Sequence, residues 1–155
     1  MEKLLDERTE QQVKEVFQSL HGDVAIIFFG SQDQNCTYCE DTKQLVTEVT
    51  SLSDKLHLEI YELEKDLEES KKYHVDKAPS FLVAAYDHGK IVDRGIRYLG
   101  IPAGHEFTSL IRDILMVSSG DSGLQPATRE FLAGLKSPIT LQVFVTPTCP
   151  YCPQA

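Results

Sequence analysis

The sequence predicts an α/β protein in which helices flank a central mixed β-sheet, followed by the start of a second unit of the same kind. Helical and extended apolar patterns alternate over the first 118 residues. "DVAIIFF" (23–29) is a continuous apolar run, which is typical of a strand buried on both faces. A helix, a strand and a C-x-x-C pair occur in that order twice.

The elements follow from apolar spacing, taken in chain order. Val13, Val16, Phe17 and Leu20 recur on one helical face and predict a helix over 3–20, and a similar pattern after the first cysteine pair predicts one over 37–53. A tight turn with glycine, "DHGK", predicts a β-hairpin near the end of the first unit. The remaining predicted elements are strands at 56–63, 80–87 and 90–100, and helices at 64–74 and 103–117.

This order gives α-β-α-β-α-β-β-α. The first strands need crossover helices and should be parallel, whereas the closing hairpin must be antiparallel. We therefore predict a thioredoxin-like fold with a central mixed sheet between helices.

A shortened repeat predicts the domain organisation. "VKEVFQSLHGDVAIIFF" (13–29) aligns with "TREFLAGLKSPITLQVF" (128–144), and a C-x-x-C follows each copy. The second copy offers an opening helix, a first strand (139–146) and the cysteine motif, so we expect a C-terminally truncated second unit. The predicted division is a complete unit at 1–118, a linker at 119–127 and the start of a second unit at 128–155.

Composition limits the class of partner and compartment. The net charge of −9 argues against nucleic acid and against an anionic membrane, because both would repel the chain. No segment has the length of a membrane span or the apolar core of a signal peptide. We expect a cytoplasmic protein, in which a C-x-x-C is more often catalytic or metal-binding than structural.

All four cysteines lie in the two C-x-x-C pairs, "CTYC" and "CPYC". A pair at the start of a helix places the first sulfur where free backbone N–H groups and the helix dipole stabilise a thiolate. Cys36 is then the expected attacking thiol and Cys39 the resolving thiol. Tyr38, between them, is expected to cover the pair and contact a substrate.

A proline completes this arrangement. Pro79 stands directly before the strand at 80–87, and a cis Ala78–Pro79 bond would explain its position. In a sheet of the predicted order, the backbone at Ala78 and Pro79 lies beside the end of the first strand. It could pair with an extended peptide and hold its disulfide over Cys36.

The chain resembles the thermophilic protein disulfide oxidoreductases, which are glutaredoxin-like proteins with two thioredoxin-fold units. The resemblance is carried by "NCTYC", "KAPS", "GIRYLGIPAGHEF" (95–107) and "FVTPTCPYCP" (144–153). It implies that Cys149 is nucleophilic and that Cys152 resolves. Tyr151, because it lies inside the second motif, is expected to shape that site and to contact a substrate. It also implies protein substrates with disulfides or dithiols, electrons from a thioredoxin-reductase-like flavoprotein, and no bound organic cofactor beyond the redox-active disulfides.

Several alternatives remain open. The chain could be an electron-relay module for a peroxiredoxin, similar to the paired thioredoxin folds of alkyl hydroperoxide reductase flavoproteins. Four cysteines in two pairs could also form a zinc or iron–sulfur module, and a purely structural disulfide is a further reading. Asp33 and Glu59 are both candidate proton acceptors, while His105 and Glu106 are interpreted as the start of a helix.

Overall fold

The computed structural model describes residues 3–33 and 35–154, so the outer ends of the predicted ranges 1–118 and 128–155 lie outside it. Its strands are β1 (Asp23–Gly30), β2 (Leu56–Glu62), β3 (Ser80–Asp87) and β4 (Lys90–Leu99). They lie in the order β2-β1-β3-β4. β1 pairs in parallel with β2, and antiparallel pairs join β1 to β3 and β3 to β4, so the predicted mixed sheet is confirmed.

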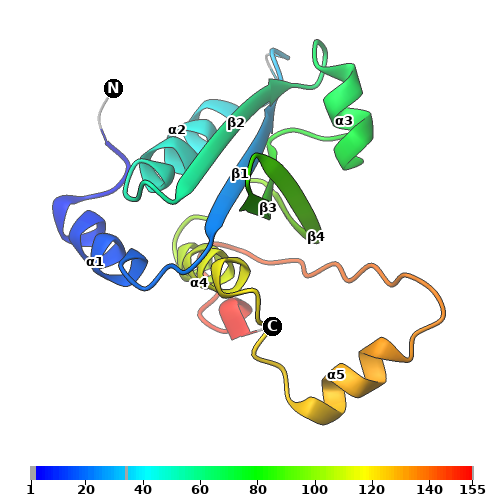
Figure 1. Cartoon of the computed structure of the whole chain (residues 1–155). Helices are drawn as coiled ribbons and strands as arrows, with labels where there is room; N and C mark the ends of the chain where they lie inside the picture. The colour runs from blue at the N-terminus through cyan, green and yellow to red at the C-terminus, as the bar shows by residue number, and fades with distance from the viewer. Residues whose placement is uncertain (1–2, 34, 155) are drawn as a thin grey trace.

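Helices cover both faces of this sheet (Figure 1). One face packs against α1 (Glu7–Phe17), α2 (Cys39–Thr50) and α4 (Glu106–Ser119). The other face carries α3 (Leu67–Tyr73), which buries Tyr73 against the sheet. Within the described ranges, no helix combines the length and the apolar character required to span a membrane.

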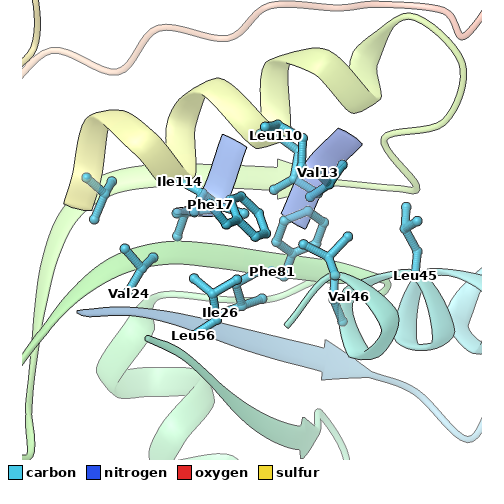
Figure 2. Packing of buried hydrophobic residues seen from close by; sticks show 14 of the residues in the cluster. Val13, Phe17, Val24, Ile26, Leu45, Val46, Leu56, Phe81, Leu110 and Ile114 are labelled. Atoms are coloured by element: carbon cyan, nitrogen blue, oxygen red, sulfur yellow. The ribbon is translucent and has the colours of Figure 1, made fainter. Parts of the chain in front are cut away.

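β1 lies at the centre of the core. Val24, Ile26 and Phe28 point to the side of α1, α2 and α4, where the larger apolar cluster lies (Figure 2). The alternate residues of the strand, Ile27 and Phe29 among them, point to the α3 side. Side chains from Val24 to Phe29 are at most 1% exposed, so the apolar run correctly predicted a strand buried on both faces.

The last part of the chain differs from the sequence-based expectation. The predicted opening helix of the second copy is present as α5 (Pro126–Ala133). The predicted strand at 139–146 is absent, and this prediction was wrong. A strand exists only by pairing its backbone with a neighbour, and no described segment pairs with these residues. Leu141 and Phe144 are consequently 87% and 89% exposed.

A backbone contact attaches the end of the chain to the first unit. The backbone N–H of His105 donates a hydrogen bond of 3.3 Å to the carbonyl oxygen of Pro147. Gly104 has a φ of +60°, and a Cβ at this position would lie 2.5 Å from the same oxygen. The glycine therefore allows Pro147 to lie directly on the first turn of α4, next to the short 3-10 turn η1 (Cys152–Gln154).

Candidate functional site

The first cysteine pair lies where β1 gives way to α2. Cys36 and Cys39 form a disulfide with a Cα–Cα distance of 5.5 Å. Cys36 lies in the turn before the helix and is half-buried, whereas Cys39 is the first residue of α2 and only 4% exposed. The helix starts two residues later than predicted because Thr37 and Tyr38 remain in this turn. A substrate could therefore reach the sulfur of Cys36 more easily than that of Cys39.

The start of α2 is ordered by backbone bonds. Thr42 donates to the carbonyl oxygen of Tyr38 through both its backbone N–H, at 2.9 Å, and its hydroxyl, at 2.6 Å. The N–H groups of the first turn point toward the cysteines and favour a negative sulfur there. The carboxylates of Glu40 and Asp41, in the same turn, oppose that effect because they carry the same charge as a thiolate.

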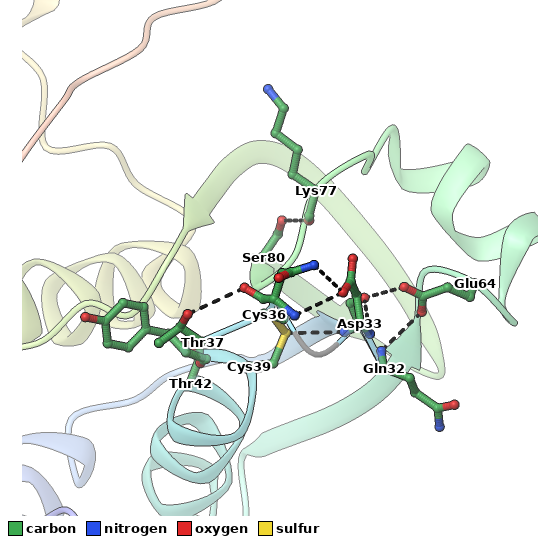
Figure 3. Close-up of a disulfide and its surroundings, with 12 residues drawn as sticks. Gln32, Asp33, Cys36, Thr37, Cys39, Thr42, Glu64, Lys77 and Ser80 are labelled. Atoms are coloured by element: carbon green, nitrogen blue, oxygen red, sulfur yellow. Dashed lines mark hydrogen bonds between the residues drawn. A yellow bond between two sulfur atoms is a disulfide. The ribbon is translucent and has the colours of Figure 1, made fainter.

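Pro79 lies at the same edge of the sheet. The Ala78–Pro79 peptide bond is cis, as predicted. Because Phe29 pairs with Ser80, Pro79 lies beside Gly30, the last residue of β1. Figure 3 shows Ser80 close to the cysteine pair, with its hydroxyl bonded to the carbonyl of Lys77.

The predicted substrate-contacting residues differ in their surroundings. Tyr38 is 54% exposed beside Cys36. The carbonyl of Pro79 accepts a bond of 2.8 Å from the N–H of Gly100, the residue after β4, so it already has a partner. Among the described contacts, none involves the backbone N–H or carbonyl of Ala78, and this residue is half-buried. Ala78 thus differs from Pro79 in having no backbone partner among the described residues.

The two candidate proton acceptors are placed differently. Asp33 is exposed in the loop before Cys36, and its carboxylate accepts 3.0 Å and 2.8 Å bonds from the backbone and side chain of Asn35. Glu59 pairs across the sheet with Ile27, whose side chain faces α3, and it accepts a bond of 2.9 Å from the Tyr61 hydroxyl. Since α2 lies on the opposite face, the sheet separates Glu59 from the cysteines.

The surroundings of Tyr61 raise the pKa of its phenol. Desolvation raises the pKa of Tyr61 well above its ordinary value, and the hydrogen bond to Glu59 raises it further. The phenol therefore stays protonated at neutral pH and occupies the Glu59 carboxylate.

The second cysteine pair is separate from the first. Cys149 and Cys152 form their own disulfide, with a Cα–Cα distance of 5.6 Å, beside the first turn of α4. Tyr151 is 77% exposed. Each pair thus closes on itself, and within the described ranges no cluster of three or more histidine, cysteine or acidic side chains has a metal-binding arrangement.

The structure adds two residues to this site that the sequence did not single out. Ser31 follows β1 and donates its backbone N–H to the sulfur of Cys39 at 3.3 Å. Glu64 follows β2 and accepts a hydrogen bond from the Ser31 hydroxyl. The parallel pairing of β1 with β2 was the signal, because it brings the ends of both strands to one edge.

The interpretation of His105 and Glu106 as a helix start is confirmed. His105 is the N-cap residue of α4 and Glu106 is its first residue. Glu106 is only 8% exposed, and its Oε1 has no hydrogen-bond partner among the described residues.

Comparisons with known proteins agree with the predicted fold and chemistry. No family model matches the chain. It is 28% identical over 151 residues to an alkyl hydroperoxide reductase component of Staphylococcus epidermidis, and the match covers 97% of this chain and 26% of that protein. The chain thus spans about a quarter of the length of this curated relative.

Two solved structures are similar over 97% of the chain. A protein disulfide oxidoreductase from Aeropyrum pernix superposes with a TM-score of 0.85 at 29% identity, over 65% of its own length. The alkylhydroperoxide reductase component AhpF of Enterococcus faecalis gives 0.78 at 25% identity, over 70% of the solved chain. The thioredoxin-like fold and the resemblance to protein disulfide oxidoreductases are confirmed, and both C-x-x-C pairs are disulfide-bonded.

Proposed function

We propose that this chain exchanges thiols and disulfides with other proteins through the pair Cys36 and Cys39. One observation carries the proposal: a half-buried cysteine and a buried cysteine are bonded at a helix start beside the cis Ala78–Pro79 bond. The similarity to the Aeropyrum pernix protein disulfide oxidoreductase supports it.

The reduced pair would act in two steps. The Cys36 thiolate attacks a substrate disulfide, forming a Cys36–substrate bond and releasing one substrate thiolate, which takes up a proton. Cys39 then loses its proton and attacks the Cys36 sulfur, restoring the Cys36–Cys39 disulfide and releasing the second substrate thiol. Two electrons and two protons pass from the dithiol to the substrate.

The backbone around Pro79 would hold the substrate during this exchange. The N–H and carbonyl of Ala78 would pair with an extended peptide, and Tyr38, which is exposed, would cover one side of the cysteine pair. The helix start would stabilise the attacking Cys36 thiolate and, in the reverse reaction, the same thiolate as it leaves the mixed disulfide.

The source and destination of the electrons belong to the same proposal. A thioredoxin-reductase-like flavoprotein would re-reduce the pair in the cytoplasm, and Cys149 with Cys152 would form a second redox pair. Residues 128–155 would then be the start of a second unit, joined through the linker at 119–127.

Trapping a substrate tests the first step. With Cys149 and Cys152 replaced by serine, Cys39→Ser should accumulate a mixed disulfide between Cys36 and a protein disulfide such as that of insulin. Cys36→Ser should accumulate none and should reduce no insulin. Equal trapping by both variants would show that Cys36 is not the attacking thiol.

The second candidate function is relay of electrons to a peroxiredoxin. It is favoured by the match to the Staphylococcus epidermidis alkyl hydroperoxide reductase component across nearly the whole chain. Reduced protein should then reduce a peroxiredoxin disulfide much faster than insulin.

Metal analysis of protein purified without chelator separately tests the four-cysteine metal alternative, which predicts stoichiometric zinc or iron.

A further inference from the structure

The loop between β1 and α2 donates two hydrogen bonds to the carboxylate of Glu64. Glu64, just after β2, accepts a hydrogen bond from the Ser31 hydroxyl at one oxygen. Its other oxygen accepts a bond of 3.4 Å from the backbone N–H of Gln32. Figure 3 shows Glu64 reaching across to this loop from the neighbouring segment. One side chain therefore fixes two consecutive residues of the loop.

Hydrogen bonds continue from this contact to Cys36. The Ser31 oxygen also accepts a bond of 3.0 Å from the backbone N–H of Asp33. The carbonyl oxygen of Asp33 accepts in turn from the N–H of Cys36, at 2.9 Å. Successive hydrogen bonds thus connect Glu64 to Cys36 through Ser31 and Asp33.

The same loop also supplies a donor to the second cysteine. The backbone N–H of Ser31 lies 3.3 Å from Sγ of Cys39, which is 4% exposed. Such a donor stabilises a sulfur more strongly as its negative charge increases, and burial increases the effect. The disulfide gains electron density on this sulfur when it is reduced, so the N–H favours the reduced pair.

The carboxylate of Glu64 is available as an acceptor at neutral pH. The hydrogen bond from the Ser31 hydroxyl lowers the pKa of Glu64, and its own backbone and the N–H of Gln32 add to this effect. Glu62, nearby, is engaged differently, with Lys65 at 2.6 Å and the Gln32 side chain at 3.2 Å.

We propose that Glu64 is a positioning residue that sets the reduction potential of the Cys36–Cys39 pair by holding the Ser31 N–H against the sulfur of Cys39. The role rests on the proposed function, since it concerns the same pair. It acts on the balance between disulfide and dithiol, in which the disulfide takes two electrons and two protons from a reductant such as glutathione. Loss of the contact makes the pair harder to reduce.

The sign of the shift in reduction potential distinguishes the positioning effect of Glu64 from the effect of its charge. A negative carboxylate near the cysteines disfavours a thiolate, so removing its charge alone would make the pair easier to reduce. Removing its hold on Ser31 has the opposite effect. Glu64→Ala removes both, Ser31→Ala removes the hydroxyl contact and keeps the charge, and Glu68→Ala, on exposed α3 surface, is the matched control.

The experiment is a redox titration of the full chain in glutathione buffers. The reduced fraction of each pair is read separately by alkylation and mass spectrometry, so Cys149 with Cys152 provides an internal reference. We expect Glu64→Ala and Ser31→Ala to shift the first pair's equilibrium at least about threefold toward the disulfide, or about 14 mV more negative. Glu68→Ala and the second pair should not move.

The proposal is overturned if Glu64→Ala makes the first pair easier to reduce, or leaves it at the wild-type value. It is also overturned if Ser31→Ala has no effect, because the contact would then not be what matters. Insulin reduction by the wild type is measured in parallel. A shift without insulin reduction would contradict the proposed function alone, and insulin reduction without a shift would contradict this inference alone.

Discussion

Replacing Gly104 by alanine should release the end of the chain from the first unit. The left-handed conformation at φ +60° costs an alanine about 1 kcal/mol. The new Cβ would also meet the Pro147 oxygen at 2.5 Å, so Pro147 must move away and the bond from His105 is lost. That bond contributes about 1 kcal/mol. The conformational cost is present whether the end of the chain is docked or not, so docking weakens by the lost bond, or about fivefold in the docked-to-undocked ratio.

Hydrogen–deuterium exchange at the His105 amide measures this directly. Exchange there should accelerate in Gly104→Ala, while the amides of β1 should remain protected because the core is unchanged. Gly120→Ala is the control, since Gly120 has a φ of +68° and no atom within 4 Å of the added Cβ. It should cost similar conformational energy without affecting His105. Unchanged His105 protection in Gly104→Ala would refute the reasoning.

Two further predictions concern stability. Phe144→Ser should change the free energy of unfolding by less than about 0.5 kcal/mol because Phe144 is 89% exposed. Phe28→Ala, at a residue that is 1% exposed, should lower the free energy of unfolding by about 4 kcal/mol. Both values are measured by urea denaturation, and equal effects would show that the end of the chain is packed. Desolvation raises the pKa of Asp113 above 3.8, only partly offset by the 2.6 Å bond from the Tyr98 hydroxyl. The native state therefore binds this proton more tightly than the unfolded chain, so the contribution of Asp113 to stability falls as the pH rises from about 3.8 through the folded-state pKa. Asp113→Asn removes this contribution, so the difference in thermal unfolding temperature between variant and wild type should change with pH in that window; a constant difference would contradict this assignment.

Much of the first unit could be predicted because its signals are local. The apolar run ending at Phe29 predicted a strand buried on both faces, and the position of Pro79 before a strand predicted the cis bond. The C-x-x-C spacing likewise predicted the first disulfide. In each case a short stretch of sequence determines the feature.

What the sequence did not predict depends on pairing between distant segments. The residues 139–146 have strand propensity, but propensity forms no strand without a partner backbone. Glu64 and Ser31 look like ordinary surface residues until β1 and β2 bring them together. Gly104 is a helix-start glycine in sequence terms, and only the structure shows Pro147 packed on it.

We propose that Cys36 is a nucleophile whose thiolate is stabilised by the start of α2. This role is tested most directly by the pH dependence of iodoacetamide alkylation of the reduced protein, resolved cysteine by cysteine by mass spectrometry. We predict that Cys36 reacts faster than Cys39, with a midpoint well below the value of about 8.5 for a free thiol. A Cys36 midpoint at or above that value, or faster labelling of Cys39, would contradict the claim.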